Sequence, residues 1–353
     1  MHVSRHPEIF SSHRRLSLFP EPSEEQLTLQ RMMMLNQDPP EHTRKRSIVN
    51  RGFTPRTIGR LEGHIRSICD TLIDEVARRD EADFVRDISA PLPLYVICEL
   101  IGAPPEDREK IFDWSNRLIA EDDPEIRAPD DDGMTAATEL YAYANELAVR
   151  RRDEPRDDIV TKLLQPHDGE ELTVEEFDLF MMLLTVAGNE TTRNAASGGM
   201  LAFFQHPDQW RRLLAERAAG GGPLSETFPD EIVRWVSPVN LFRRTAVRDT
   251  ELGGRNIAEG DKVVVFYSSA NRDADVFTDP YAFDIGRDPN PQIGFGGGGP
   301  HFCLGAHLAR LELRVLFEAL LERMPDITQT GEARRLRSNF INGIKEMPVR
   351  FSR

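Results

Sequence analysis

The residues best suited to chemistry lie in the stretch FGGGGPHFCLG, which runs from Phe295 to Gly305. Its consecutive glycines permit positive φ angles and let the backbone approach a ligand closely. Cys303 follows them and precedes an apolar helical pattern, where free N–H groups and the helix dipole favour negative charge. We therefore expect the Cys303 thiol to ionise readily, and a thiolate acts either as a nucleophile or as a metal ligand.

The neighbouring residues leave three interpretations of Cys303 open. A nucleophile needs a general base, for which His301 is a candidate. A zinc site needs three further ligands, and no second cysteine or paired histidine is close by in the sequence. A phosphate-binding loop would end in Lys-Ser/Thr, which is missing here. The spacing favours a metal thiolate over a structural cysteine or a nucleophile.

The other two cysteines, Cys69 and Cys98, stand in apolar patterns and are predicted to be small buried packing residues. Three widely spaced cysteines do not form a disulfide framework, which favours a reducing, cytosolic setting. The N-terminus lacks the apolar region of a signal peptide, and no apolar run is long enough to predict a membrane span.

A second candidate lies in a long helix predicted from Thr173 to about Gln205. Thr173 and Glu176 have the spacing of a capping box. The sequence VAGNETT then places Glu190 and Thr191 midway along a cylinder that is otherwise apolar, where polar side chains need a reason. In the simplest interpretation, the Thr191 hydroxyl bonds the carbonyl of the preceding turn and bends the helix.

The elements around these motifs predict one mainly α-helical domain with a small β portion, over residues 1–353. The first 180 or so residues are mostly helical patterns, and after Pro238 short strand patterns follow, such as KVVVFYSSANRD. After Cys303 a helical face is formed by Leu304, Leu308, Leu311, Val315 and Leu316. The net charge of −15 argues against nucleic acid or an anionic membrane as a general partner.

The pattern F-x-x-G-x-x-x-x-C-x-G, carried by Phe295, Gly298, Cys303 and Gly305, resembles the haem-binding loop of the cytochrome P-450 family. Longer phrases such as SANRDADVF resemble its soluble bacterial members, above all actinobacterial enzymes that hydroxylate sterols, terpenoids or branched fatty acids. The resemblance implies the P-450 fold, with haem b between the long central helix and the helix after Cys303. It also implies that Cys303 is the proximal ligand of the iron.

The resemblance assigns roles to further residues. Glu190 and Thr191 look like the acid and alcohol that relay protons, with Ala187 and Gly188 beside them leaving room for dioxygen. The implied haem contacts, including propionate partners, are His42, Arg46, Ala187, Gly188, Arg244, Phe295, His301 and Gly305.

Spacing alone makes Glu231 and Arg234 a surface ion pair. The family instead has a buried network here, for which Arg287 looks like the third member. Hypothetical substrate-pocket residues, chosen by position, are Leu183, Val186, Val239, Leu241, Phe340 and Ile341.

The implied function is a monooxygenase that uses O2 on a bulky hydrophobic substrate. Ferredoxin and ferredoxin reductase would bring electrons from NAD(P)H, and Arg44 and Lys45 are expected to dock the acidic redox partner. The alternatives are a peroxide-driven peroxygenase, a haem isomerase, or an impaired haem-binding remnant. Family members carry a further helix and two strands before the HPEIF segment, so we expect KVVVFYSSA to lie at an apolar sheet edge.

Overall fold

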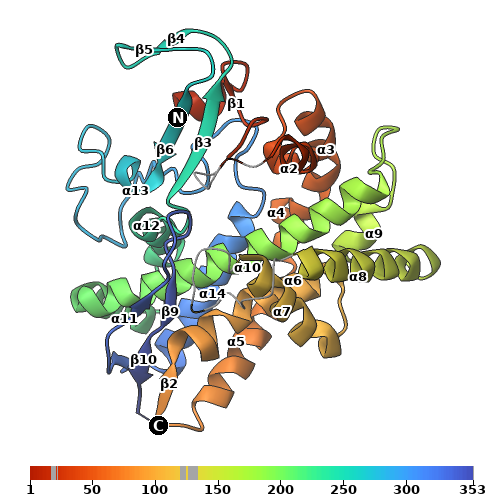
Figure 1. Ribbon diagram of the computed structural model, residues 1–353. Helices are drawn as coiled ribbons and strands as arrows, with labels where there is room; N and C mark the ends of the chain where they lie inside the picture. Colours follow the sequence, from red (N-terminus) through yellow and green to blue (C-terminus); the bar gives the residue numbers. More distant parts are fainter. Residues whose placement is uncertain (17–20, 22, 120–124, 126–133, 353) are drawn as a thin grey trace.

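The computed structural model describes residues 1–16, 21, 23–119, 125 and 134–352, and Figure 1 shows how their elements are arranged. Helices dominate, and the strands form small sheets at two places in the molecule. This agrees with the predicted mainly α-helical fold with a small β portion.

The long helix α10 (Val174–Gln205) crosses the molecule and organises the other helices. It begins at the predicted capping box, in which the Thr173 side chain accepts from Glu176 N and the Glu176 carboxylate accepts from Thr173 N. The helices in contact with α10 are α6 (Pro91–Ile101), α7 (Arg108–Ile119), α8 (Met134–Asp153), α11 (Pro207–Ala218), α12 (Leu224–Val236) and α14 (Ala306–Arg323).

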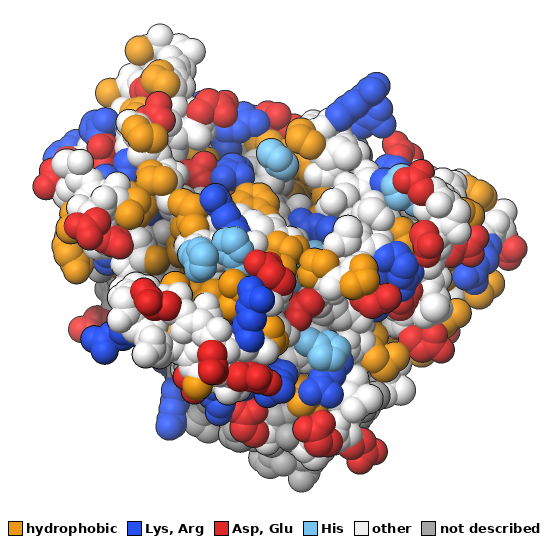
Figure 2. Space-filling view, turned by 90° about the horizontal axis from the view of Figure 1, so that it is seen from above, with side chains coloured by type: hydrophobic (Ala, Val, Ile, Leu, Met, Phe, Trp, Pro, Cys, Tyr) orange, Lys and Arg blue, Asp and Glu red, His pale blue; other side chains and the backbone are white. Residues whose placement is uncertain are grey.

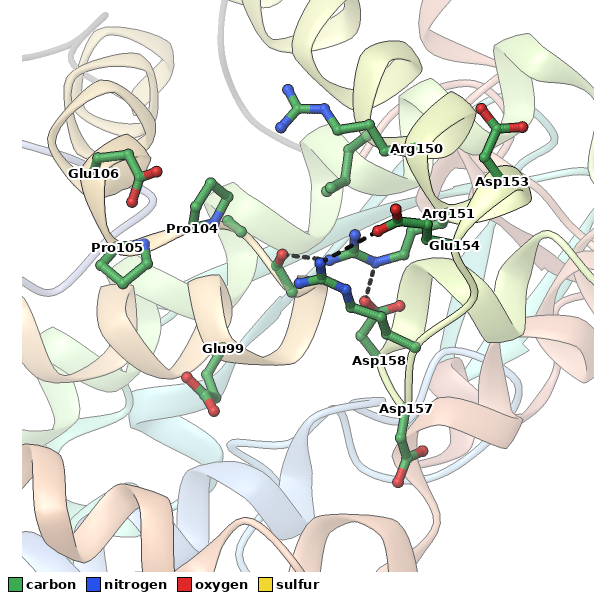
Figure 3. A pocket seen from close by; sticks show the side chains of 14 residues that line it. Glu99, Pro104, Pro105, Glu106, Arg150, Arg151, Asp153, Glu154, Asp157 and Asp158 are labelled. Atoms are coloured by element: carbon green, nitrogen blue, oxygen red, sulfur yellow. Dashed lines mark hydrogen bonds and ion pairs between the residues drawn. The ribbon is translucent and has the colours of Figure 1, made fainter.

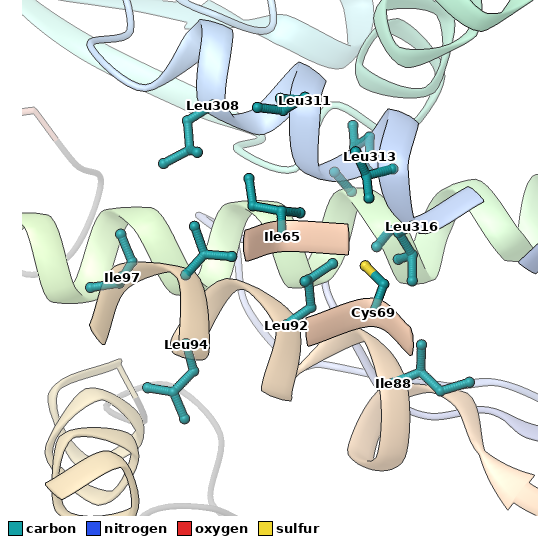
Figure 4. Close-up of a cluster of buried hydrophobic side chains, with 14 of the residues drawn as sticks. Ile65, Cys69, Ile88, Leu92, Leu94, Ile97, Leu308, Leu311, Leu313 and Leu316 are labelled. Atoms are coloured by element: carbon teal, nitrogen blue, oxygen red, sulfur yellow. The ribbon is translucent and has the colours of Figure 1, made fainter. Parts of the chain in front are cut away.

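The core lies where α5 (Glu62–Val76), α6 and α14 meet beside α10 (Figure 4). Leu308, Leu311, Val315 and Leu316 of α14 are buried there, because the spacing of three and four residues puts them on one helix face. The predicted face therefore forms, except that Leu304 precedes the helix. Cys69 and Cys98 are fully buried, as predicted for packing residues.

The sheet nearest the site consists of β1 (Phe10–Ser11), β3 (Leu241–Ala246) and β6 (Lys262–Phe266), in the order β1-β3-β6. All pairs are antiparallel, with Phe242 opposite Val265. The predicted strand KVVVFYSSANRD ends at Phe266, where α13 (Tyr267–Ala270) begins. β6 lies at the edge of this sheet and its Phe266 side chain is exposed, as expected.

The second sheet, of order β2-β10-β7, and the pair β8-β9 lie toward the C-terminus. Their bounds are β2 (Glu81–Asp83), β7 (Thr328–Gln329), β8 (Arg334–Arg335), β9 (Ile344–Glu346) and β10 (Pro348–Arg350). The remaining elements are α1 (His2–Arg5), α2 (Glu24–Gln30), α3 (Glu41–Asn50), α4 (Pro55–Gly59), α9 (Ile159–Leu163), and the hairpin of β4 (Thr250–Leu252) and β5 (Arg255–Ile257).

Candidate functional site

An internal cavity separates α10 from the loop that carries Cys303. Its walls come from α3, α10, β3, α14 and the segment Gly294–Gly305. Most lining side chains are apolar, and these include Leu16, Met34, Leu35, Phe53, Phe180, Leu184, Ala195, Phe242 and Leu308. The polar lining side chains lie on a few of these elements, so the cavity is mostly apolar and its polar groups are confined to small regions of the wall.

The glycine-rich loop carries Cys303 to the cavity wall. Gly296, Gly297, Gly298 and Gly299 all have positive φ, which glycine adopts without strain. A Cβ on Gly299 would lie 2.0 Å from the Ser4 carbonyl oxygen, so only glycine fits beneath α1 there. The Cys303 N–H donates to the Phe295 carbonyl at 2.8 Å, which closes the loop. The predicted loop residues Phe295, Cys303 and Gly305 all line the cavity.

The expectation that the Cys303 thiol ionises readily is wrong for the protein without a bound cation. Burial raises the pKa of this thiol, although the Gly305 N–H and the guanidinium groups of Arg46 and Arg310 act in the opposite direction. Desolvation raises this pKa more than the hydrogen bond from the Gly305 N–H, at the start of α14, lowers it. The thiolate therefore needs a cation at the sulfur itself, and a metal ion provides one.

Four basic side chains converge on one end of the cavity. His42 and Arg46 come from α3, Arg244 comes from β3, and His301 comes from the Cys303 loop. Burial lowers the pKa of His42 to about 4 and that of His301 to about 3, so both rings are neutral N–H donors at pH 7. Arg46 donates to the Phe302 carbonyl at 2.7 Å and Arg244 donates to the Arg243 carbonyl at 2.8 Å.

This basic end has unused binding capacity. His42 Nδ1 is buried and has no hydrogen-bond partner among the residues that the structure describes. Asp38 is the carboxylate whose charge acts on both His42 and Arg244, and it is already bonded to Ser11 and Ser12. Within the described ranges, the guanidinium groups of Arg46 and Arg244 and the two neutral imidazole rings are therefore compensated only by the Asp38 carboxylate. Such a group of donors forms a site for anionic groups. The two propionates of a haem fit this end, and its iron fits Cys303 on the cavity wall.

Of the two predicted proton-relay residues, Thr191 lines the cavity and Glu190 does not. The Thr191 hydroxyl donates to the Ala187 carbonyl at 2.8 Å, as the sequence predicts, and Thr191 lines the cavity together with Ala187. Glu190 is 2% exposed and is not among the lining residues, because consecutive helix residues point about 100° apart. Its carboxylate instead pairs with Arg193 and accepts from Asn194 Nδ2 at 3.0 Å.

Gly188 lines the cavity, but its small size serves another contact. A Cβ on Gly188 would lie 2.5 Å from Cδ1 of Ile97 in α6. The missing side chain therefore lets α10 and α6 approach closely at a point where Gly188 and Ile97 both line the cavity, and the space for dioxygen beside Thr191 stays a prediction.

Leu183 and Val239 are the predicted substrate residues that line the cavity, and the other four do not. On β3, Phe242 and Arg244 line the cavity, so Leu241 points to the opposite face of the strand. Phe340 packs behind the wall with its ring centroid 5.4 Å from that of Phe242, and Ile341 pairs with Val239. Val186 lies on another face of α10 from the lining residues Leu183, Ala187 and Thr191.

Among the lining residues that the sequence analysis missed, Glu312 of α14 is the most unusual. It is 1% exposed, its Oε2 has no hydrogen-bond partner within the described part of the chain, and burial raises the pKa of its carboxyl to about 8. A sequence signal existed, because Glu312 stands four residues from both Leu308 and Leu316 on the apolar face of the helix.

Glu231, Arg234 and Arg287 form one buried ion network. Arg234 Nε and Nη2 donate to the two Glu231 oxygens at 2.7 and 2.8 Å, and Arg287 Nε donates to Glu231 Oε2 at 3.2 Å. Arg234 also donates to the carbonyls of Asn271, Pro280 and Ala282. The surface ion pair suggested by spacing alone is therefore wrong, since both side chains are fully buried.

This network lies directly upstream of the Cys303 loop. The Asn271 carbonyl accepts from Arg234, and Asn271 Oδ1 accepts from Ile293 N at 2.8 Å. The start of the loop is thereby tied to α12.

The expected docking charges are engaged within the fold. Lys45 is 6% exposed, and its Nζ lies 3.2 Å from Glu176 and bonds the Met32 carbonyl. Arg44 pairs with Glu41, Glu170 and Glu176. The assignment of Arg44 and Lys45 to partner docking is therefore wrong, because α3 turns both toward the start of α10. On the face drawn in Figure 2, cationic and anionic side chains are interspersed.

A second cavity of about 680 Å³ lies away from this site, between the end of α6 and the end of α8 (Figure 3). Arg151 donates to the Gly102 carbonyl at 2.6 Å and pairs with Asp158, which closes its floor. The side chains around it are largely charged, and it shares no residue with the cavity at Cys303.

Comparisons with known proteins decide the family. A family model for cytochrome P-450 matches residues 133–339. The chain belongs to the cytochrome P-450 family. Two solved P-450 structures have the same fold as this P-450. One from Mycobacterium marinum, in complex with pseudoionone, has a TM-score of 0.90 and 38% identity over 99% of this chain and 84% of that chain. One from Bacillus megaterium, in complex with testosterone, has a TM-score of 0.86 and 34% identity over 100% and 91%.

Curated relatives of this P-450 are monooxygenases and hydroxylases. A steroid C26-monooxygenase of Rhodococcus jostii is 48% identical over 98% of this chain and 72% of its own length. A methyl-branched lipid omega-hydroxylase of Mycobacterium tuberculosis is 43% identical over 99% of this chain and 82% of its own length. The predicted family, fold and monooxygenase class are thereby confirmed. None of the helices in the described ranges has the length and apolar character needed to cross a bilayer.

Proposed function

We propose that this P-450 inserts one oxygen atom of O2 into a C–H bond of a steroid or a methyl-branched lipid. Its electrons come from NAD(P)H through a ferredoxin reductase and a ferredoxin, and it acts in the cytoplasm. The observation that carries the proposal is the position of Cys303 on the wall of an apolar cavity that is also lined by Thr191 and by the basic side chains of its one end.

The side chains divide the work of such a reaction. Cys303 would hold the iron, and His42, Arg46, Arg244 and His301 would hold the propionates. When bound, the haem supplies the activation of dioxygen, which a thiolate ligand favours.

The protein supplies the protons of the same reaction. The Thr191 hydroxyl is on the cavity wall and would hold a proton at Oγ1 for delivery into the cavity. Glu190, one residue before Thr191 on α10, would replenish that proton from the side of Arg193.

The substrate class is supported by the lining and by the relatives. Phe180, Leu183, Leu184, Val239 and Phe242 offer apolar and aromatic contacts, which suit a bulky hydrocarbon. The two relatives described above act on a steroid and on a methyl-branched lipid. Both have branched aliphatic carbons, so the proposed target is a C–H bond of that kind.

Reconstituted turnover tests the proposal. The haem-loaded protein is incubated with cholesterol or phytanic acid, once with NADPH, ferredoxin reductase and ferredoxin, and once with hydrogen peroxide alone. We expect hydroxylated product in the first mixture, preceded by a shift of the haem from low to high spin on probe binding. Product with peroxide alone, and none with the electron chain, would identify a peroxygenase and overturn the proposal.

A further inference from the structure

The Glu190 carboxylate is held by the next turn of its own helix. One oxygen pairs with Arg193, and the other accepts from Asn194 Nδ2 at 3.0 Å. Neither Glu190 nor Asn194 lines the cavity, whereas Thr191 between them does. Arg193 and Asn194 therefore determine the position of the Glu190 carboxylate. That position in turn determines whether a proton can pass from Glu190 to Thr191.

Asn194 also reaches outside α10. Its Nδ2 donates to the carbonyl and the carboxylate of Glu190, at 2.9 and 3.0 Å, while its Oδ1 accepts from the N–H of Ile344 at 3.2 Å. These partners fix the orientation of the amide, because a flipped amide would face N–H against N–H and oxygen against oxygen. Asn194 is 1% exposed and Ile344 is 2% exposed, so water does not replace either contact.

The space around this amide is small. A Cβ on Gly343 would lie 3.0 Å from Asn194 Oδ1 and also 3.0 Å from two atoms of Leu336. Ile344 is the first residue of β9, so a displacement of this strand start is transmitted to Asn194.

The chain that leads into Ile344 is bonded to the cavity wall. Asn240 N donates to the Phe340 carbonyl at 2.8 Å, and Asn342 N donates to the Pro238 carbonyl at 2.9 Å. Between these bonds, Val239 pairs with Ile341. Pro238 and Val239 line the cavity. A molecule that presses on this wall therefore presses on the segment that ends at the Asn194 contact.

We propose that Asn194 is a positioning residue that couples occupation of the cavity to the placement of the Glu190 carboxylate. The inference rests on the proposed function, in which Glu190 supplies protons through Thr191. Filling the cavity shifts the wall at Pro238 and Val239, the shift reaches Ile344, and Asn194 moves the carboxylate that it holds. Proton delivery is then favoured when a substrate is present, because a ligand shifts a protein toward the arrangement to which it binds better.

Two variants separate the two ends of Asn194. Asn194→Ala removes all three hydrogen bonds of the side chain, two to Glu190 and one from Ile344 N. Asn194→Asp keeps an acceptor for Ile344 N and places a negative oxygen opposite Glu190. The matched control is Ser197→Ala on the same helix. Ser197 is also buried, and its hydroxyl forms a hydrogen bond outside α10, with the Ser89 hydroxyl at 2.7 Å.

The first measurement needs no turnover. Hydrogen–deuterium exchange of the Ile344 amide is followed in the haem-loaded protein with and without cholesterol. We expect cholesterol to change this exchange rate by about threefold or more in the parent and in Ser197→Ala, a change at the low end of such couplings. In Asn194→Ala the Ile344 amide has lost the acceptor that the shift would move, so the effect of cholesterol on its exchange should be lost. An equal effect of cholesterol in Asn194→Ala and in the parent would overturn the proposal.

The second measurement addresses the protons. We expect both Asn194 variants to bind cholesterol within about twofold of the parent, with an unchanged spectrum of the CO complex. The fraction of NADPH electrons recovered in product should fall about threefold or more, and the solvent deuterium isotope effect should rise. Coupling and isotope effect equal to those of Ser197→Ala in both variants would contradict the proposal. A parent without turnover would defeat the proposed function, and the exchange measurement would still decide on Asn194.

Discussion

The imidazole rings of His42 and His301 lie 4.2 Å apart between centroids, although one belongs to α3 and the other to the loop before Cys303. Both are neutral at pH 7, and Ser12 Oγ lies 3.2 Å from His301 Nε2. The positive charge at this end of the cavity therefore comes from Arg46 and Arg244.

Arg244→Ala should weaken haem retention. A hydrogen bond to a charged group contributes about 1.5–3 kcal/mol, so haem affinity should fall on the order of 10- to 100-fold. The rate of haem transfer to excess apomyoglobin measures this change. The control is Arg248→Ala, because Arg248 is exposed just beyond the same strand. Equal transfer rates in the two variants would remove Arg244 from the haem contacts.

Cys303→Ala should abolish the spectral signature of thiolate ligation. The reduced CO complex should lose its red-shifted Soret band, and most of the haem should dissociate, since no other thiolate lines the described part of the cavity. Absorption spectra and haem content of the purified variant check this. Cys98→Ala, which alters a buried cysteine of α6, should keep the band. A red-shifted band in Cys303→Ala would show that the iron has another ligand.

Thr191→Ala should separate electron consumption from product formation. Without the hydroxyl on the cavity wall, NADPH oxidation continues but its electrons leave as hydrogen peroxide. Product per NADPH should fall by about tenfold or more, because general acids contribute at least this much. Thr185→Ala is the matched control, since Thr185 makes the same kind of bond to the Met181 carbonyl at 2.9 Å but does not line the cavity. Full coupling in Thr191→Ala would exclude this hydroxyl from proton delivery.

Glu312→Gln should change how stability depends on pH. The ordinary pKa of the carboxyl is 4.5, and burial raises the pKa of Glu312 to about 8. Between these values the folded protein keeps a proton that the unfolded chain releases, so the free energy of unfolding decreases as pH rises. The titratable group that senses the charge of Glu312 is the thiol of Cys69, whose own pKa burial raises.

Urea unfolding at pH 5 and pH 8 measures the effect of Glu312→Gln. The variant should match the parent at pH 5 within about 1 kcal/mol and exceed it by a few kcal/mol at pH 8, at about 1.4 kcal/mol per pH unit. Glu322→Gln, which alters an exposed carboxylate of the same helix, should keep the slope of the parent. The buried neutral rings of His42 and His301 contribute equally to both proteins, so equal slopes in the parent and in Glu312→Gln would mean that Glu312 is ionised in the folded protein.

The sequence predicted best those features that one helix determines by itself. The capping box of α10 and the bond from Thr191 to Ala187 follow from spacings of three and four residues, and both are present. The residues of the substrate pocket were harder to predict. Side chains of β3 alternate between the two faces of the sheet, so a shift of one residue decides whether Leu241 or Phe242 lines the cavity.

Partners that are distant in the chain could not be predicted. Arg44 and Lys45 looked free because Glu176 is far away in the sequence, and only the packing of α3 against the start of α10 joins them. Glu190 illustrates the same point, since its position in the helix was predicted but its contacts with Arg193 and Asn194 were not.

Glu176 has two structural roles, since it caps the start of α10 and also holds α3 in place. The same carboxylate that bonds Thr173 N also anchors Arg44 and Lys45, whose neighbours His42 and Arg46 face the cavity from α3. Charge reversal at Arg44 or Lys45, introduced to map where an electron donor attaches, would loosen α3 and disturb the prosthetic group. Slower reduction in such variants would then report damaged cofactor seating, so haem content has to be measured before any docking surface is deduced.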